Sequence, residues 1–143
     1  MLILASVLMV AAAAIPLVLG TMHLVLTWRG PKLTPDDPAV IEAMRGSSAQ
    51  LNPSANMWRL WVGFNASHGI GAVQYGLVFG ILAITVPDVL FDSWPLMALA
   101  IAVPVAYLLV GLRYWFRVPT TGVGISAAFA IAAVTVAQVG NLG

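Results

Sequence analysis

The hydrophobic positions of this chain fall into four long runs that contain no charged side chain. The runs cover residues 1–28, 60–87, 93–112 and 118–143. Every Lys, Arg, Asp and Glu lies in the three connections between them. A helix that crosses the roughly 30 Å hydrocarbon core of a bilayer needs about 20 apolar residues, because each residue adds about 1.5 Å. The pattern therefore predicts four transmembrane helices.

These runs predict an all-α fold, a four-transmembrane-helix antiparallel bundle that forms a single membrane domain over residues 1–143. We expect the helices at about 2–28, 57–86, 94–116 and 119–139. The second and third connections are short, which makes the helices that they join antiparallel neighbours.

The first connection, residues 29–56, is too long for a simple turn. Asp37 followed by Pro38 is typical of a helix start, with Asp as the N-cap and Pro in the first turn. Apolar residues then recur at helical spacing, at Ala39, Val40, Ala43 and Met44. We expect a short amphipathic helix here, lying on the membrane or on the bundle, with a polar return over residues 46–56.

Composition agrees with a membrane protein and excludes several kinds of chemistry. Hydrophobic residues make up 61% of the chain and charged residues 8%, against about 25% charged in soluble domains. Cysteine is absent, which excludes disulfides, thiolate metal sites and cysteine nucleophiles. The net charge of +1 gives no reason to expect nucleic acid. No basic residue precedes the first run, which is also too long for a cleaved signal, so we expect the first helix to be retained.

The basic residues predict the orientation. Four of them lie in the first connection or directly after it and two in the third, whereas the second connection contains only Asp88 and Asp92 as charged residues. By the positive-inside bias, connections 29–56 and 113–118 are cytoplasmic and both termini are periplasmic. Tryptophans lie near the predicted helix ends, where they act as interfacial anchors, at Trp28, Trp58, Trp61, Trp94 and Trp115.

Four polar side chains in the first two helices are candidates for a site. His23 lies six residues before Arg29, and Asn65 lies six residues after Arg59, so both are about 9 Å inside the same boundary. His68 is one turn deeper, and Thr27 follows His23 on the same side of its helix. Polar groups in lipid are costly unless they face the bundle and are paired, so we expect these four to point at one another.

Two stripes divide the second helix. Asn65 and His68 share one with Trp61, Ala72 and Tyr75. Small residues form another, at Gly63, Ser67, Gly71, Gly76 and Gly80. Such spacing lets another helix approach closely, and we expect that helix to belong to this chain rather than to a second copy. In the third helix, Pro104 is expected to produce a kink and to free a carbonyl one turn earlier.

Several functions can use the polar cluster. His23 and His68 could ligate a haem b from two helices, with Asn65, Thr27 and Tyr75 around it. The same cluster could bind a quinone or another lipophile, with Tyr75, Tyr107 and Trp61 as walls. A proton relay has no intramembrane carboxylate to complete it. The remaining interpretation is structural, in which a buried, hydrogen-bonded cluster fixes the helix register.

The residues give little support to catalysis. All carboxylates lie in the connections, which removes paired-acid chemistry from the membrane interior. Ser67 and His68 diverge by about 100° around a helix, so they do not form a nucleophile and base pair. Two histidines alone leave a zinc or di-iron centre short of ligands.

Three segments of the chain resemble a family of small bacterial four-helix integral membrane proteins that has no assigned activity. They are residues 20–24 (GTMHL), 57–68 (MWRLWVGFNASH) and 113–116 (RYWF). The resemblance implies the architecture and a bacterial inner-membrane location, but no reaction. It also places His23, Asn65 and His68 at positions that match the family pattern.

We therefore expect an accessory or structural subunit, or a partner-binding module, of a larger bacterial inner-membrane complex. Its partners would be membrane lipids and other membrane subunits, and its ligands a pigment, a quinone or another lipophile. The alternative is a bis-histidine haem b or quinone-binding protein that uses His23 and His68.

Overall fold

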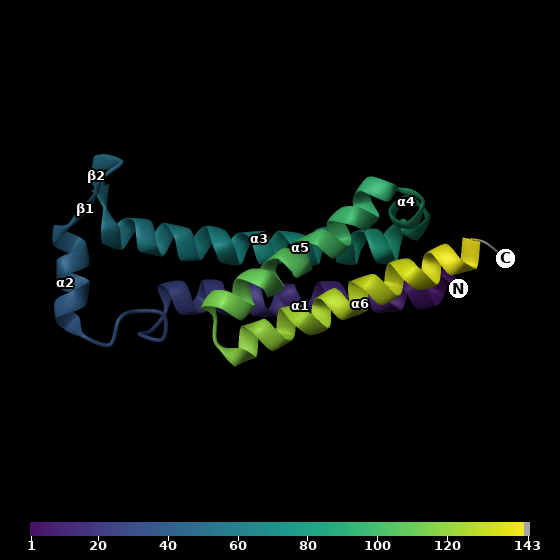
Figure 1. Ribbon diagram of the computed structural model, residues 1–143, viewed down its shortest axis with the longest axis horizontal. Coiled ribbons are helices and arrows are strands. Elements are labelled where there is room, and N and C mark those ends of the chain that lie inside the picture. Colours follow the sequence, from purple (N-terminus) through teal and green to yellow (C-terminus); the bar gives the residue numbers. More distant parts are fainter. Residues whose placement is uncertain (142–143) are drawn as a thin grey trace. The chain divides into compact units, whose positions relative to one another are not determined.

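The computed structural model describes residues 1–141, which are mostly helical (Figure 1). Its elements in chain order are α1 (Leu2–Trp28), α2 (Pro38–Gly46), β1 (Ser48–Ala49), β2 (Asn52–Asn56), α3 (Met57–Thr85), α4 (Pro87–Asp92), α5 (Trp94–Tyr114) and α6 (Arg117–Asn141). Helices α1, α3, α5 and α6 are each long and apolar enough to cross a membrane. The four predicted helices are confirmed, although α5 ends at Tyr114 and α6 already begins at Arg117.

The chain forms two compact units, and α1 and α3 contribute to both of them. The first unit comprises Met1–Leu19 and Ala72–Gly143, and the second comprises Gly20–Gly71. Helices α4, α5 and α6 lie in the first unit, whereas α2 and the two strands lie in the second.

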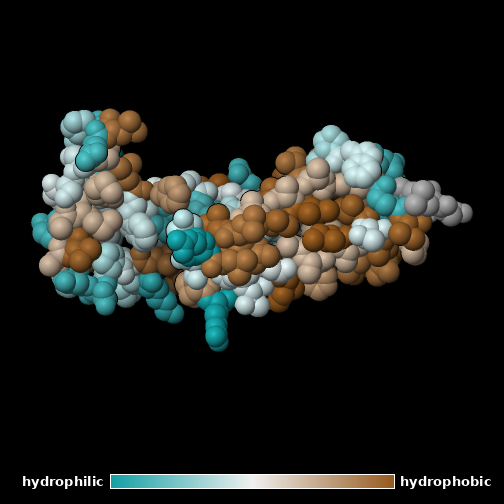
Figure 2. Space-filling view, viewed as in Figure 1, coloured by the Kyte–Doolittle hydropathy of each residue, from teal (hydrophilic) through white to brown (hydrophobic). Residues whose placement is uncertain are grey.

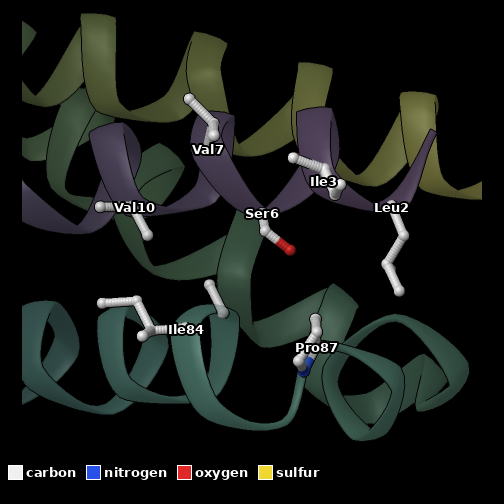
Figure 3. Close-up of a pocket in the computed structure, with 8 residues that line it drawn as sticks. Leu2, Ile3, Ser6, Val7, Val10, Ile84 and Pro87 are labelled. Atoms are coloured by element: carbon white, nitrogen blue, oxygen red, sulfur yellow. The ribbon is translucent and has the colours of Figure 1, made fainter.

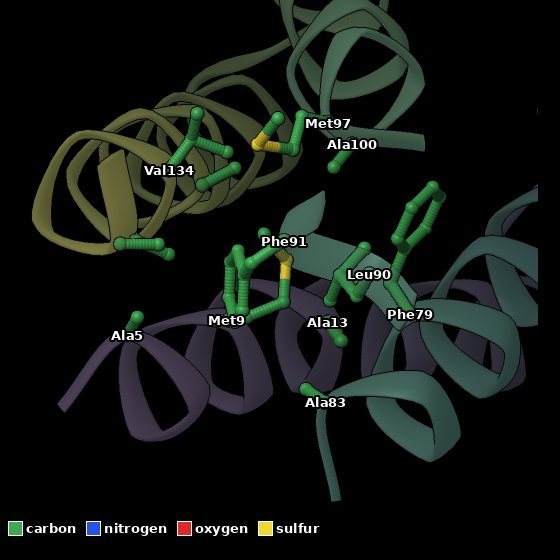
Figure 4. Close-up of a cluster of buried hydrophobic side chains, with 14 of the residues drawn as sticks. Ala5, Met9, Ala13, Phe79, Ala83, Leu90, Phe91, Met97, Ala100 and Val134 are labelled. Atoms are coloured by element: carbon green, nitrogen blue, oxygen red, sulfur yellow. The ribbon is translucent and has the colours of Figure 1, made fainter. Parts of the chain in front are cut away.

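The first unit has a core of large side chains set among alanines (Figure 4). Met9, Leu90, Phe91 and Met97 are almost completely buried there. Alanines at the helix contacts are fully buried as well, at Ala5, Ala12, Ala100, Ala130 and Ala133. Small side chains let helix backbones approach closely, so that dispersion contacts accumulate between them.

Helix α4 was not predicted, because the segment between α3 and α5 was expected to be only a short connection. Pro87 occupies its first turn, where the missing N–H costs no hydrogen bond. Leu90 and Phe91 project from it into the core of the first unit. The segment thus closes this end of the unit with two large apolar side chains.

The predicted free carbonyl in α5 has a partner on another helix. Pro104 has no N–H to donate to the Ala100 carbonyl, four residues earlier. The Tyr75 hydroxyl, from α3, donates to that oxygen at 2.7 Å. The bond is buried, so the hydroxyl replaces the backbone donor where water cannot.

The same arrangement recurs in α1. Pro16 lies inside this helix and leaves the Ala12 carbonyl without its usual donor. Ser126, from α6, donates to it at 2.7 Å, and this bond is also buried. Two helices of the first unit therefore depend on a neighbour to complete their backbone hydrogen bonds.

A side chain of α6 also bonds the end of α4. Phe91 is in the last turn of α4, where backbone carbonyls have no partner within the helix. The Gln138 side chain, from α6, donates to that oxygen at 3.0 Å.

The second unit contains the predicted N-capped helix and an unpredicted hairpin. An Asp37 carboxylate oxygen accepts from the backbone N–H of Ala39 at 2.8 Å, which confirms the cap of α2. The guanidinium of Arg45, in the last turn of α2, lies 5.6 Å from the Trp58 ring centre. Strands β1 and β2 then pair as an antiparallel hairpin in the segment expected only as a polar return.

Candidate polar site at His23, Asn65 and His68

Three of the four predicted polar side chains meet within the second unit. His23 on α1 and Asn65 on α3 are joined by a hydrogen bond of 3.1 Å between Nε2 and Oδ1. The ring of His68 lies against His23, with ring centres 5.0 Å apart and planes at 72°. All three side chains are half-buried. Equal depth in the two helices, counted from Arg29 and Arg59, correctly predicted the contact between His23 and Asn65.

The Asn65 amide determines where the His23 proton lies. Its Nδ2 donates to the Trp61 carbonyl, one turn earlier on α3, at 2.8 Å. This bond leaves Oδ1, which only accepts, directed at His23. The Nε2 of His23 must therefore carry the hydrogen, and in a neutral ring Nδ1 is the acceptor.

The other two residues expected at this site are engaged elsewhere. The Thr27 hydroxyl donates to the carbonyl of His23, on its own helix, at 2.8 Å. It caps a backbone group and does not join the imidazoles. Tyr75 belongs to the first unit, where its hydroxyl bonds the Ala100 carbonyl. The hydroxyl of Tyr75 is thus engaged within the first unit, and its place beside a cofactor at His23 and His68 stays a prediction.

The ring geometry does not fit a haem held between the two histidines. With metal–nitrogen distances of about 2 Å, imidazoles on opposite faces of one iron have centres about 6 Å apart, with the porphyrin between them. Here the rings touch edge to face at 5.0 Å. The Nε2 of His23 is also occupied by its bond to Asn65. Within residues 1–141, no group of three or more His, Cys, Asp or Glu side chains could hold a metal ion.

The small residues of α3 differ in what they contact. A Cβ added at Gly76 would lie 2.6 Å from the Leu17 Cβ and 2.7 Å from the Ala13 carbonyl oxygen, both on α1. Only glycine allows this approach. At Gly80 an added Cβ would lie 3.7 Å from the Ala13 Cβ, an ordinary contact.

The half of the predicted stripe nearer the start of α3 does not make the expected contact within the chain. Gly63 and Ser67 are exposed, and a Cβ added at Gly63 would have no neighbour within 4 Å. Gly71 is half-buried. The close approach of α1 in this unit uses Gly69 instead, where an added Cβ would lie 2.8 Å from Leu24. A helix that is apolar on all sides gives no periodic signal to identify Gly69 in advance.

The tryptophans differ in their surroundings. Trp28 and Trp94 are exposed, as expected for anchors, and Trp115 is half-buried. Trp58 is half-buried beneath Arg45. The indole N–H of Trp61 donates to the Leu33 carbonyl at 3.2 Å, which ties the first connection to α3. No sequence pattern pointed to that last contact.

Comparisons with known protein families, with curated proteins and with solved structures find no match.

Proposed function

We propose that this chain is a multi-pass protein of the bacterial inner membrane that serves as an accessory or structural subunit of a larger complex. The four apolar helices support the membrane location. Large apolar side chains are exposed along all of them, including Val18, Ile81, Leu109 and Ile131. In Figure 2, hydrophobic residues cover the visible surface of α5 and α6. Such a surface is favourable in lipid and unfavourable in water.

The distribution of charge supports one orientation. The basic residues all lie in or directly beside the connections 29–56 and 113–118. In the proposed topology these connections are cytoplasmic and both termini are periplasmic. The exposed amphipathic helix α2 would then rest on the cytoplasmic surface of the membrane.

The observation that supports a partner is the exposed face of α3 around Gly63. Leu60, Gly63, Phe64 and Ser67 lie on one helix face, at the spacing of successive turns, and all are exposed. Glycine inside a helix costs about 1 kcal/mol relative to alanine. No neighbour within this chain requires a glycine at position 63, because the space beside it is open.

Contact with a helix from another subunit would explain the glycine at position 63. The gap at Gly63 and the small side chain of Ser67 allow a second helix to approach closely, with Leu60 and Phe64 beside it. Phe64, which is 75% exposed, would then be covered. The hydrogen bond between His23 and Asn65 holds α1 and α3 in register behind this face.

The absence of cysteine makes a crosslinking test direct. Gly63→Cys, labelled with a thiol-reactive photocrosslinker in native membranes, should give one discrete adduct with a different protein. Leu109→Cys, at an exposed position on α5, is the matched control and should give none. Gly63→Leu should abolish the assembly on a native gel and leave the helix content unchanged, because the side chain has room in the isolated chain.

Other outcomes would contradict the proposal. If the protein at native expression migrates alone on the gel and Gly63→Cys gives no discrete adduct, it has no subunit partner on this face. An adduct of twice the chain's mass would assign the face to a second copy.

A further inference from the structure

A groove between α1 and α6 has a chemical asymmetry that the proposed function does not use. It is lined by residues within 14–19 of α1 and 117–125 of α6, and its volume is about 660 Å³. We call it the Arg117 groove. All of its lining residues belong to the first unit. They are apolar or small except at one end, where Arg117 and Thr121 lie one turn apart on α6.

From this asymmetry we propose that the Arg117 groove binds an anionic phospholipid, with an acyl chain along the apolar floor and the phosphate at Arg117. The inference rests on the membrane location proposed above, but it does not require a protein partner. A phospholipid has the same order of groups as the groove, an anionic head followed by a long apolar tail.

The apolar part of the groove has the dimensions of an acyl-chain segment. Eight residues separate Arg117 from Ile125, which corresponds to about 12 Å along α6. Gly122 keeps the groove narrow, because a Cβ there would lie 2.7 Å from a Leu19 methyl group. The helices therefore meet at the floor, and the channel between Val18 and Ile125 stays open to one side.

The polar end attracts a phosphate for three reasons. Arg117 is the only charged residue in the lining. The two carboxylates of this unit, Asp88 and Asp92, precede α5, whereas Arg117 follows its other end, so no acid of the unit neutralises it. Arg117 is also the first residue of α6, where the helix dipole and the free N–H groups favour an anion.

The side chains that precede Arg117 are of the kind found at a membrane interface. Tyr114 and Phe116 are both exposed and immediately precede it. Aromatic side chains concentrate at the membrane interface, and arginine there reaches phosphate oxygens while its stem stays in the apolar region. Arg113 lies nearby in the sequence, in the last turn of α5. Its guanidinium lies 5.8 Å from the Tyr114 ring centre, and it does not line the groove.

A second groove is also apolar but has no charged residue in its lining (Figure 3). It has a volume of about 410 Å³ and lies between the start of α1 and residues 83–87. Its only polar side chain in the lining is Ser6, whose hydroxyl points into the space on the side of Pro87 (Figure 3). Nothing there selects a charged headgroup, so it serves as the internal comparison.

The test uses the full chain, purified in mild detergent and exchanged with dioleoyl-phosphatidylglycerol or dioleoyl-phosphatidylcholine, with retained lipid counted by native mass spectrometry. The wild type should retain one phosphatidylglycerol in preference to phosphatidylcholine. Arg117→Gln should weaken that retention roughly fivefold, and Arg113→Gln, which removes the same charge, should change it less than twofold. Val18→Phe should block the acyl chain, whereas Val7→Phe, the same change in the second groove, should not. Circular dichroism of each variant verifies that it is folded.

Three results would overturn the inference. The first is equal retention of the two lipids, and the second is equal weakening by Arg117→Gln and Arg113→Gln. The third is a discrete protein adduct from Val18→Cys in native membranes, which would assign the groove to a partner helix. Flotation with vesicles separates this inference from the function proposed above. A chain that does not float contradicts the membrane location, whereas a chain that floats without retained phosphatidylglycerol contradicts the lipid site alone.

Discussion

Replacing Ser126 by alanine tests whether the proline-containing helices depend on side chains from their neighbours. The Ser126 side chain is 0% exposed, and its hydroxyl donates at 2.7 Å to the Ala12 carbonyl. The backbone N–H that would normally bond this oxygen is missing, because residue 16 is proline. Ser126→Ala removes one oxygen atom and leaves the carbonyl without a donor.

Two known ranges of free energy set the expected loss of stability in Ser126→Ala. An unsatisfied buried acceptor costs about 1–3 kcal/mol. Side-chain hydrogen bonds between membrane helices average only about 0.6 kcal/mol, with a maximum near 1.7, because the separated helices find other partners. The Ala12 carbonyl has no backbone N–H at residue 16 to bond to, and the site is buried. We therefore expect Ser126→Ala to lower the free energy of unfolding by about 1.5 kcal/mol. That is roughly a tenfold change in the unfolding equilibrium constant.

The assay is reversible unfolding in mixed micelles with increasing sodium dodecyl sulfate, followed by circular dichroism. A double-mutant cycle with Pro16→Ala isolates the interaction, since alanine restores the N–H to the Ala12 carbonyl. In that background, Ser126→Ala should cost less than about 0.5 kcal/mol. Ser67→Ala is the control, because this exposed hydroxyl bonds only within its own helix. Equal costs of Ser126→Ala with and without Pro16 would refute the reasoning.

Three further predictions use the same preparation. Gly76→Ala should destabilise the chain by about 1–3 kcal/mol, since the new methyl group would lie 2.6 Å from a side-chain atom of α1, whereas Gly63→Ala should be neutral or slightly stabilising. Equal effects of the two in the unfolding titration would contradict the contacts described. Asp37→Ala should cost α2 about 1 kcal/mol of local stability, seen as faster amide hydrogen exchange in α2 alone. Unchanged exchange there would show that the cap is not needed. Asn65→Leu should cost about 0.5–1.5 kcal/mol in the wild type and much less in a His23→Leu background, whereas additive costs would show that the two side chains act independently.

The sequence was sufficient to predict features that depend on position along the chain. Charge-free runs predicted the four long helices, because a helix that can cross a bilayer needs about 20 consecutive apolar residues. Asp37 and Pro38 gave the start of α2, because capping is local. Depth counted from the flanking arginines gave the contact between His23 and Asn65.

Features that depend on the direction of a side chain were harder to predict. The long helices are apolar around their whole circumference, so no stripe marks the buried face. The bond of Tyr75 to the Ala100 carbonyl was therefore not predicted, and Gly63 was expected to pack as Gly76 does. Pro104 correctly indicated a free carbonyl in α5, but nothing in the sequence identified which hydroxyl would bond it.

The bond from Ser126 to Ala12 joins residues 114 positions apart. Translation produces α1 first of the four long helices and α6 last, so α1 is made while the Ala12 carbonyl still lacks its donor. The Ser126 hydroxyl that bonds this oxygen is made only after all the intervening segments. Until α6 has been made, the Ala12 carbonyl must bond to another donor, such as water.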